Sequence, residues 1–254
     1  MKARIAVWLT IGVWITMPST VHAQVVAPQP SVVKTFAVLP QDVAFARFIS
    51  LIRGHLLTGD ELVGQREWDA ASPHFNFPRE EIYGIIREQL AIYKTPQFDG
   101  ALKALARAVK ARNAKQYQMA KAKVEDALAA ADTGLKAKAP NWPRFVVAVA
   151  IEVLKTAPDE YDDAIGTGRN LGRIMRPIGY QTARGFVLQA ERMFENVADD
   201  LGSTNATALS DIRTGFVELK QSLTKVNAPK QAIIDYSMFV GIISKIELAA
   251  GKLT

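Results

Sequence analysis

Two histidines are the residues of this chain whose type and placement best suit metal chemistry. His55 and His74 lie in neighbouring segments of helical periodicity, each on or near the apolar face of its segment. Antiparallel packing of these segments would bring the two imidazole rings together. Glu61 and Glu81 are close in sequence, and imidazole with carboxylate suits iron, copper or zinc. We therefore identify His55, His74, Glu61 and Glu81 as candidate ligands of a transition metal ion.

The same histidines have a purely structural interpretation as hydrogen-bonded residues of the core. The sequence contains no His-x-x-x-His, Glu-x-x-His or His-x-x-Glu spacing, so the pattern of di-iron helix bundles is absent. Glu152 and Glu191 fall in or beside apolar stripes farther along the chain. Such carboxylates bind cations or form ion pairs with arginines such as Arg184, and the ion pair is the simpler expectation.

Three glycines in the pattern Gly166-x-Gly168-x-x-x-Gly172 superficially resemble a phosphate-binding loop. No strand precedes them, and the third glycine comes one position late for a dinucleotide fingerprint. We interpret the segment as a helix stop and a flexible connection. Arg169 and Arg173 within it could bind an anion.

Catalytic motifs and thiols are both missing from the sequence. There is no nucleophile elbow, Walker loop or zinc-protease helix. The chain has 0 cysteines, which excludes a thiol nucleophile, a zinc-thiolate site, an iron–sulfur cluster and a covalently attached c-type haem. We expect a protein that is not an enzyme.

The first residues are typical of an export signal. Residues 1–23 combine basic residues, an apolar run over 5–17 and the small residue Ala23 at the end, which predicts cleavage near Ala23. The apolar run is too short for a membrane-spanning helix, which needs about 20 residues. Residues 24–40 contain several prolines and predict an extended leader. We therefore expect a periplasmic or secreted protein.

The charge and the remaining apolar segments limit the partners. Removing Lys2 and Arg4 with the signal lowers the formal charge from +6 to +4, and the remaining basic residues are interspersed with acidic ones. This pattern does not favour nucleic acid. The most apolar later stretch, 145–154, is short and contains Glu152, so we expect no membrane span in the mature chain.

The elements that must position these residues are helices. Apolar stripes at helical spacing predict an all-α protein of antiparallel hairpins with about nine helices after the signal peptide. We expect N-terminal helical hairpins over 41–138, a break at 139–143 and a C-terminal four-helix bundle over 143–254. One continuous domain is the alternative. The bundle patterns cover 143–165, 178–200, 204–226 and 230–251.

One of the predicted hairpins resembles a known repeat. Gly59, Leu62, Trp68, Ala71 and Phe75 have the spacing of a tetratricopeptide-type hairpin, in which small residues let two helices approach and aromatics fill the flanks. Residues 98–108 repeat the second-helix spacing. The resemblance implies a concave surface for a protein or peptide partner and no chemistry.

Two functions follow from these patterns. The first is a soluble exported helical protein, of unknown oligomeric state, that holds a macromolecular partner. The second is an exported metal-binding or metal-handling protein that uses His55 and His74 with nearby carboxylates.

Overall fold

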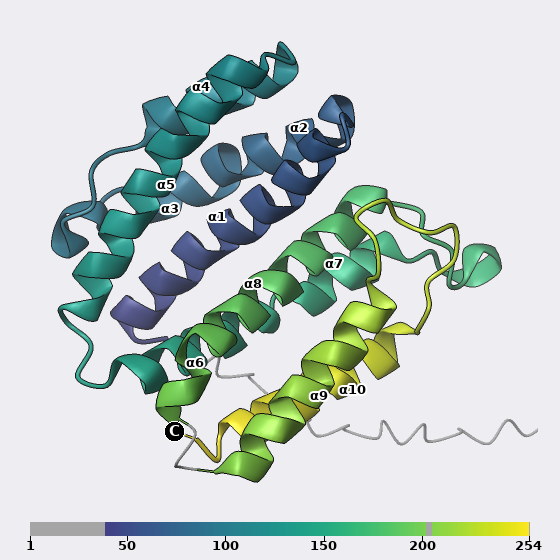
Figure 1. Cartoon of the computed structure of the whole chain (residues 1–254). Coiled ribbons are helices and arrows are strands. Elements are labelled where there is room, and N and C mark those ends of the chain that lie inside the picture. Colours follow the sequence, from purple (N-terminus) through teal and green to yellow (C-terminus); the bar gives the residue numbers. More distant parts are fainter. Residues whose placement is uncertain (1–38, 202–204, 254) are drawn as a thin grey trace, which may run out of the picture. The chain divides into compact units, whose positions relative to one another are not determined.

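A computed structural model describes residues 39–201 and 205–253 (Figure 1). The predicted signal peptide, its cleavage site and the leader up to residue 38 lie outside the described residues. Within the described ranges, the regular elements are helices, joined by turns and two isolated β-bridges. The prediction of an all-α helix bundle is confirmed.

The N-terminal half consists of long helices interrupted by short turns. Helix α1 packs against α2 in an antiparallel hairpin, and a π-helical turn follows α2. Helix α2 packs on α4, and α4 packs on α5. The elements are α1 (Gln41–Gly64), α2 (Trp68–Phe77), η1 (Pro78–Tyr83), α3 (Gly84–Ile86), η2 (Leu90–Tyr93), α4 (Asp99–Lys110) and α5 (Ala114–Lys136).

The C-terminal half is built around one long helix. Helix α8 packs against α6, α7 and α9, while α10 packs against α9 and also reaches α6 and α7. The elements are α6 (Trp142–Leu154), α7 (Ala157–Ala164), η3 (Gly168–Asn170), α8 (Pro177–Leu201), α9 (Ala206–Ser222) and α10 (Tyr236–Ala250).

Polar side chains fix the first turns of several helices. Asn113, Asn141 and Asn205 each precede a helix and accept a hydrogen bond from the backbone N–H three residues later, at 3.0–3.1 Å. Asp235 does the same for α10 at 2.8 Å. These caps satisfy amides that would otherwise have no partner, which explains where α5, α6, α9 and α10 begin.

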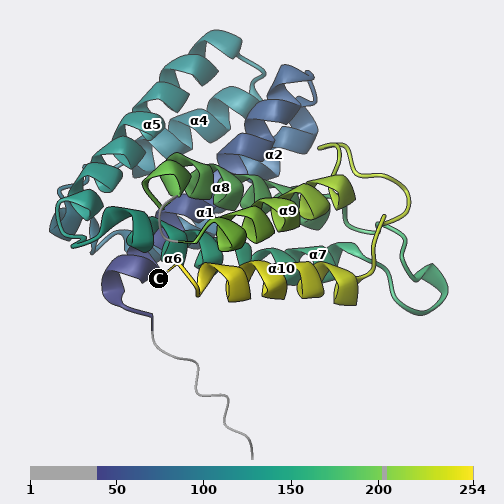
Figure 2. The same ribbon diagram turned by 60° about the horizontal axis from the view of Figure 1, so that its bottom comes forward.

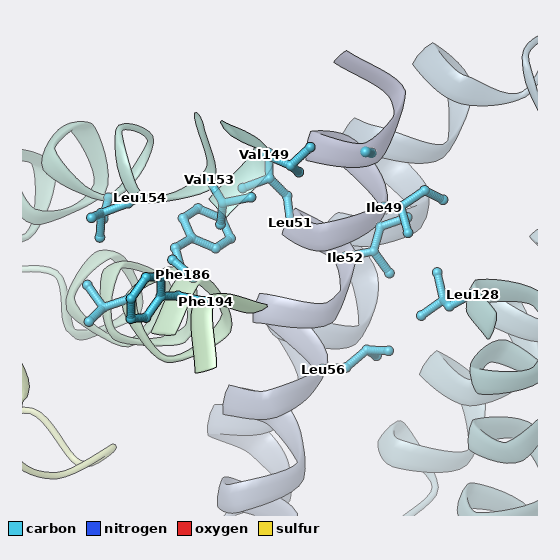
Figure 3. Close-up of a cluster of buried hydrophobic side chains, with 14 of the residues drawn as sticks. Ile49, Leu51, Ile52, Leu56, Leu128, Val149, Val153, Leu154, Phe186 and Phe194 are labelled. Carbon is cyan, nitrogen blue, oxygen red and sulfur yellow. The ribbon is translucent and has the colours of Figure 1, made fainter. Parts of the chain in front are cut away.

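Helix α1 is central because it is apolar on two sides. Ile52 and Leu56 face Leu128 of α5 (Figure 3). Leu51 faces the opposite way, toward Phe186 of α8 and the valines of α6 (Figure 3). A helix with apolar residues on opposite faces is stable only when both are covered. Residues Leu39–Thr254 accordingly form one compact unit with a continuous hydrophobic core.

Small residues let α1 and α8 approach closely. A Cβ added at Gly185 would lie 2.4 Å from the backbone oxygen of Gly54 and 2.4 Å from Thr58 Oγ1. A Cβ at Gly59, on the same helix α1, would lie 2.5 Å from the Phe75 ring of α2. The glycines thus place α2 and α8 directly against α1, where the two histidines lie.

Candidate functional site

The structure brings the two histidines together. His55 of α1 and His74 of α2 are 5% and 0% exposed, and their ring centroids are 5.8 Å apart. Phe77 and Phe186 pack edge-on against His55, with centroids at 5.7 Å and 5.2 Å. Three helices, α1, α2 and α8, therefore enclose the pair in an aromatic shell.

Helix α8 also supplies the polar partner of the pair. His74 Nε2 lies 3.2 Å from Oε1 of Gln181, whose backbone oxygen accepts a hydrogen bond from Thr58 at 3.1 Å. An amide oxygen only accepts, so the Nε2 of a neutral His74 carries the proton and its Nδ1 keeps the lone pair. Within the described structure, Nδ1 of His74 and Nδ1 of His55 have no hydrogen-bond partner.

Burial holds both rings in the neutral form. Desolvation is the main cause that lowers the pKa of His55 to about 3, and the charge of the neighbouring His74 acts in the same direction. Desolvation lowers the pKa of His74 to about 4, although the hydrogen bond to Gln181 opposes it. Neutral imidazole is the form that ligates metals, so each ring offers a nitrogen lone pair at physiological pH.

One of the two carboxylates predicted to join the histidines has another partner, and the other lies in an acidic environment. Glu61 forms an ion pair with Arg184 of α8 at 2.5 Å. Glu81 contributes to the electrostatic field around Glu160 of α7. Among the described residues, no group of three His, Asp or Glu side chains is placed to hold a metal ion. The histidines alone thus offer fewer ligands than the four that a structural zinc site takes.

Glu160 is the centre of a group of acidic side chains. Burial raises its pKa to about 7, and repulsion from Asp163, Glu81 and Asp159 acts in the same direction. Arg176 opposes this rise and forms an ion pair with Asp163. A proton on Glu160 therefore relieves both the burial of charge and the crowding of like charges.

A cleft of about 600 Å³ lies between α1, α5, α6 and α8. Its polar wall carries the ion pairs Arg53–Asp132 at 2.7 Å and Lys121–Asp60 at 2.5 Å. Both carboxylates are thus matched by a cation, and they are poor candidates for binding a metal. The sequence did not reveal this cleft, because its lining residues come from four helices and share no short-range spacing.

The two carboxylates noted in later segments form ion pairs. Glu152 pairs with Lys155 at 3.0 Å, and Glu191 pairs with Lys220 at 2.6 Å. The partners are lysines, whereas arginines were expected from the sequence.

Across the described ranges, no helix is both long and apolar enough to cross a membrane.

Comparison with known proteins finds one similarity. Residues 137–252, a little under half of the chain, match a family described as the iron permease-associated 4-helix bundle domain. No curated protein and no solved structure matches the chain. The matched segment begins at the turn after α5 and ends just beyond α10, so it covers all of the helices α6 to α10.

This match corrects the leading functional prediction. The interpretation of the chain as a soluble exported protein that holds a macromolecular partner is wrong, because the description of the matched family refers to an iron permease. The match supports the metal-handling alternative better. No tetratricopeptide family is matched, and the matched segment does not include 59–75, so what the structure shows of that resemblance is a hairpin of the helices α1 and α2.

Proposed function

We propose that this protein acts in iron uptake as a helical component associated with an iron permease. The observation that carries the proposal is the match of residues 137–252 to the iron permease-associated bundle family. That description favours iron over the copper and zinc that the candidate ligands also suit. On this proposal the chain is exported, as residues 1–23 predict.

The histidine pair is the part of the proposal that single side chains can test. Gln181, which bonds His74, lies inside the matched segment, whereas His55 and His74 lie outside it. The pair therefore sits where the matched bundle meets the N-terminal helices. Each neutral ring supplies one nitrogen ligand, and because both rings are buried, an ion would reach them only through an opening between α1, α2 and α8 that also admits its further ligands.

Iron accumulation in living cells tests the role. A strain that lacks the gene should take up less radioactive iron under iron limitation, and the wild-type gene should restore uptake. Manganese and zinc uptake should stay unchanged and serve as controls for a general envelope defect. Equal iron uptake with and without the gene would overturn the proposal.

A second comparison tests the histidines within that role. His55→Leu combined with His74→Leu removes both imidazoles, and Phe77→Leu perturbs packing in the same aromatic shell without removing a ligand. If the rings contact iron, the double variant should restore little uptake and Phe77→Leu should restore most of it, at equal protein levels. Full restoration by the double variant would show that the iron role does not use the histidines.

A further inference from the structure

Two connections at one end of the bundle form a single structured surface. We call residues 165–176, between α7 and α8, together with residues 223–238, between α9 and the start of α10, the loop platform. The backbone N–H of Ala232 donates to the oxygen of Gly172 at 2.8 Å, and a β-bridge lies alongside. Figure 1 and Figure 2 show both connections at the same end of the bundle.

The first connection has a defined backbone of its own. Gly166 donates to the oxygen of Arg173 at 2.8 Å, and Ile174 donates to the oxygen of Lys230 at 3.1 Å. Gly168 and Gly172 have φ angles of 57° and 75°, which side chains with a Cβ rarely adopt. The glycine pattern noted in the sequence therefore builds a tight, hydrogen-bonded turn.

Large apolar side chains project into solvent from this platform. Of the ten exposed large hydrophobic residues in the described part of the chain, five belong to it: Leu171 at 74%, Met238 at 56%, Ile233 at 54%, Met175 at 50% and Tyr236 at 39%. Isolated exposed apolar residues are ordinary, but a concentration on one structured surface indicates a contact with something apolar.

Basic side chains accompany the apolar ones. Residues 165–176 contain three arginines and no acidic residue, and residues 223–238 contain two lysines and one aspartate. The aspartate, Asp235, caps α10, and Arg176 is paired with Asp163. Within the described residues, no ion pair joins a carboxylate to the other four cations: Arg169, Arg173, Lys225 and Lys230.

We infer that the loop platform docks this protein onto a bilayer surface that carries anionic phospholipid headgroups. Exposed apolar side chains enter the boundary between headgroups and acyl chains, while arginine and lysine remain at the level of the phosphates. Tyrosine suits the same interface because its ring is apolar and its hydroxyl is polar. Lysine is depleted in protein–protein interfaces, whereas arginine, methionine and tyrosine are enriched there, so the two lysines, Lys225 and Lys230, are the residues that favour lipid over a protein partner.

This inference goes beyond the proposed role in iron uptake and rests on none of its observations. It assigns a place for the bundle at the membrane surface, with the 165–176 and 223–238 connections toward the lipid. The α1–α2 turn lies beside this surface, because Asn227 of the second connection donates a hydrogen bond to Gln65 at the end of α1, at 2.8 Å. Lipid binding by the purified protein needs neither iron nor a permease. Failure of one proposal is therefore distinguishable from failure of the other.

Vesicle co-sedimentation tests the platform. The purified protein is mixed with vesicles of phosphatidylcholine alone or of an equal mixture of phosphatidylcholine and phosphatidylglycerol. We expect binding to the anionic vesicles, which weakens as salt rises. Arg169→Gln with Arg173→Gln should weaken binding by on the order of tenfold, and Leu171→Ser with Ile233→Ser by a similar factor.

Matched control variants carry the same kinds of substitution at exposed residues outside the loop platform. Leu248→Ser removes a side chain that is 71% exposed at the far end of α10, and Lys103→Gln with Lys123→Gln removes two exposed cations of α4 and α5. All variants share the same N-terminal residues, so any lipid affinity of that segment cancels in the comparison. Circular dichroism should show equal helicity, since all replaced side chains are exposed.

Three results would overturn the inference. The first is no preference of the wild type for anionic vesicles. The second is unchanged binding in both platform variants. The third is an equal loss in the control variants. Recruitment only to vesicles that contain a membrane protein would also overturn it and would assign the surface to a protein partner.

Discussion

Replacing His55 with leucine should make the protein more resistant to mild acid. In the folded chain the pKa of His55 is lowered to about 3, whereas an unfolded histidine titrates at its ordinary 6.5. Below pH 6.5 the unfolded chain therefore binds a proton that the folded chain does not. Proton binding to the unfolded chain lowers the free energy of unfolding. The protein therefore keeps its full stability above pH 6.5 and loses it as pH falls from 6.5 toward 3.

The size of the effect follows from the two pKa values. Between pH 7 and pH 5, the free energy of unfolding should fall by about 2 kcal/mol for each buried histidine. His74, whose pKa is lowered to about 4, contributes a similar amount. The wild type should thus lose about 4 kcal/mol from the pair, and His55→Leu only about 2 kcal/mol. The other titrating groups are common to both proteins and cancel in the difference.

Urea unfolding followed by circular dichroism at pH 7 and pH 5, at constant ionic strength, measures this difference. Phe77→Leu is the matched control, because it removes packing against His55 without removing a titrating group. It should lower stability at both pH values and keep the pH dependence of the wild type. An unchanged pH dependence in His55→Leu would refute the burial of a neutral imidazole at this position.

Two further changes probe the rest of the structure. Burial and the neighbouring Asp163 raise the pKa of Glu160 from its ordinary 4.5 to about 7, so the folded state loses stability as pH rises from 4.5 through 7. The free energy of unfolding of Glu160→Gln, measured relative to the wild type, should therefore be higher at pH 8 than at pH 5, by about 1–2 kcal/mol because Glu160 is only partly buried. Urea titrations that give the same difference between variant and wild type at both pH values would contradict this. Gly185→Ala places a Cβ 2.4 Å from the oxygen of Gly54 and should lower stability by about 2–3 kcal/mol in thermal melts. Gly241→Ala, whose Cβ would meet nothing within 4 Å, should be neutral or slightly stabilising, and equal melting of the two variants would argue against the close packing of α1 on α8.

Helices could be predicted from the sequence because periodicity and capping are local. Their ends were less predictable. In the segment 143–165 a kink or a break was expected at Pro158. The structure has a break, because α6 ends at Leu154 and Pro158 lies in the first turn of α7, where a proline loses no hydrogen bond. The last helix begins at Tyr236 and not near 230, because Asp235 caps it and 223–235 takes part in the loop platform.

The meeting of His55 and His74 was also accessible from the sequence, since both belong to one antiparallel hairpin. The rest of the site was not. Gln181 lies 107 residues from His74, and Arg184 lies 123 residues from Glu61. Nearness in sequence suggested Glu61 as a third ligand, but in the fold its carboxylate forms an ion pair with Arg184. Contacts between distant segments leave no trace in short-range spacing.

The packing of α1 on α8 decides how the family match bears on function. The matched segment covers α6 to α10, yet Phe186 and Gly185 of α8 are covered by α1, which lies outside it. The bundle in this chain therefore presents to its surroundings only the faces that α1 to α5 leave open, among them the loop platform. The side of α8 that bears Gln181 faces the histidines, because that residue bonds His74. A change at the histidine pair would act on the bundle through α8, whereas a change at the platform would act on its outer surface. The two sites can for this reason be altered separately, and iron uptake and lipid binding need not change together.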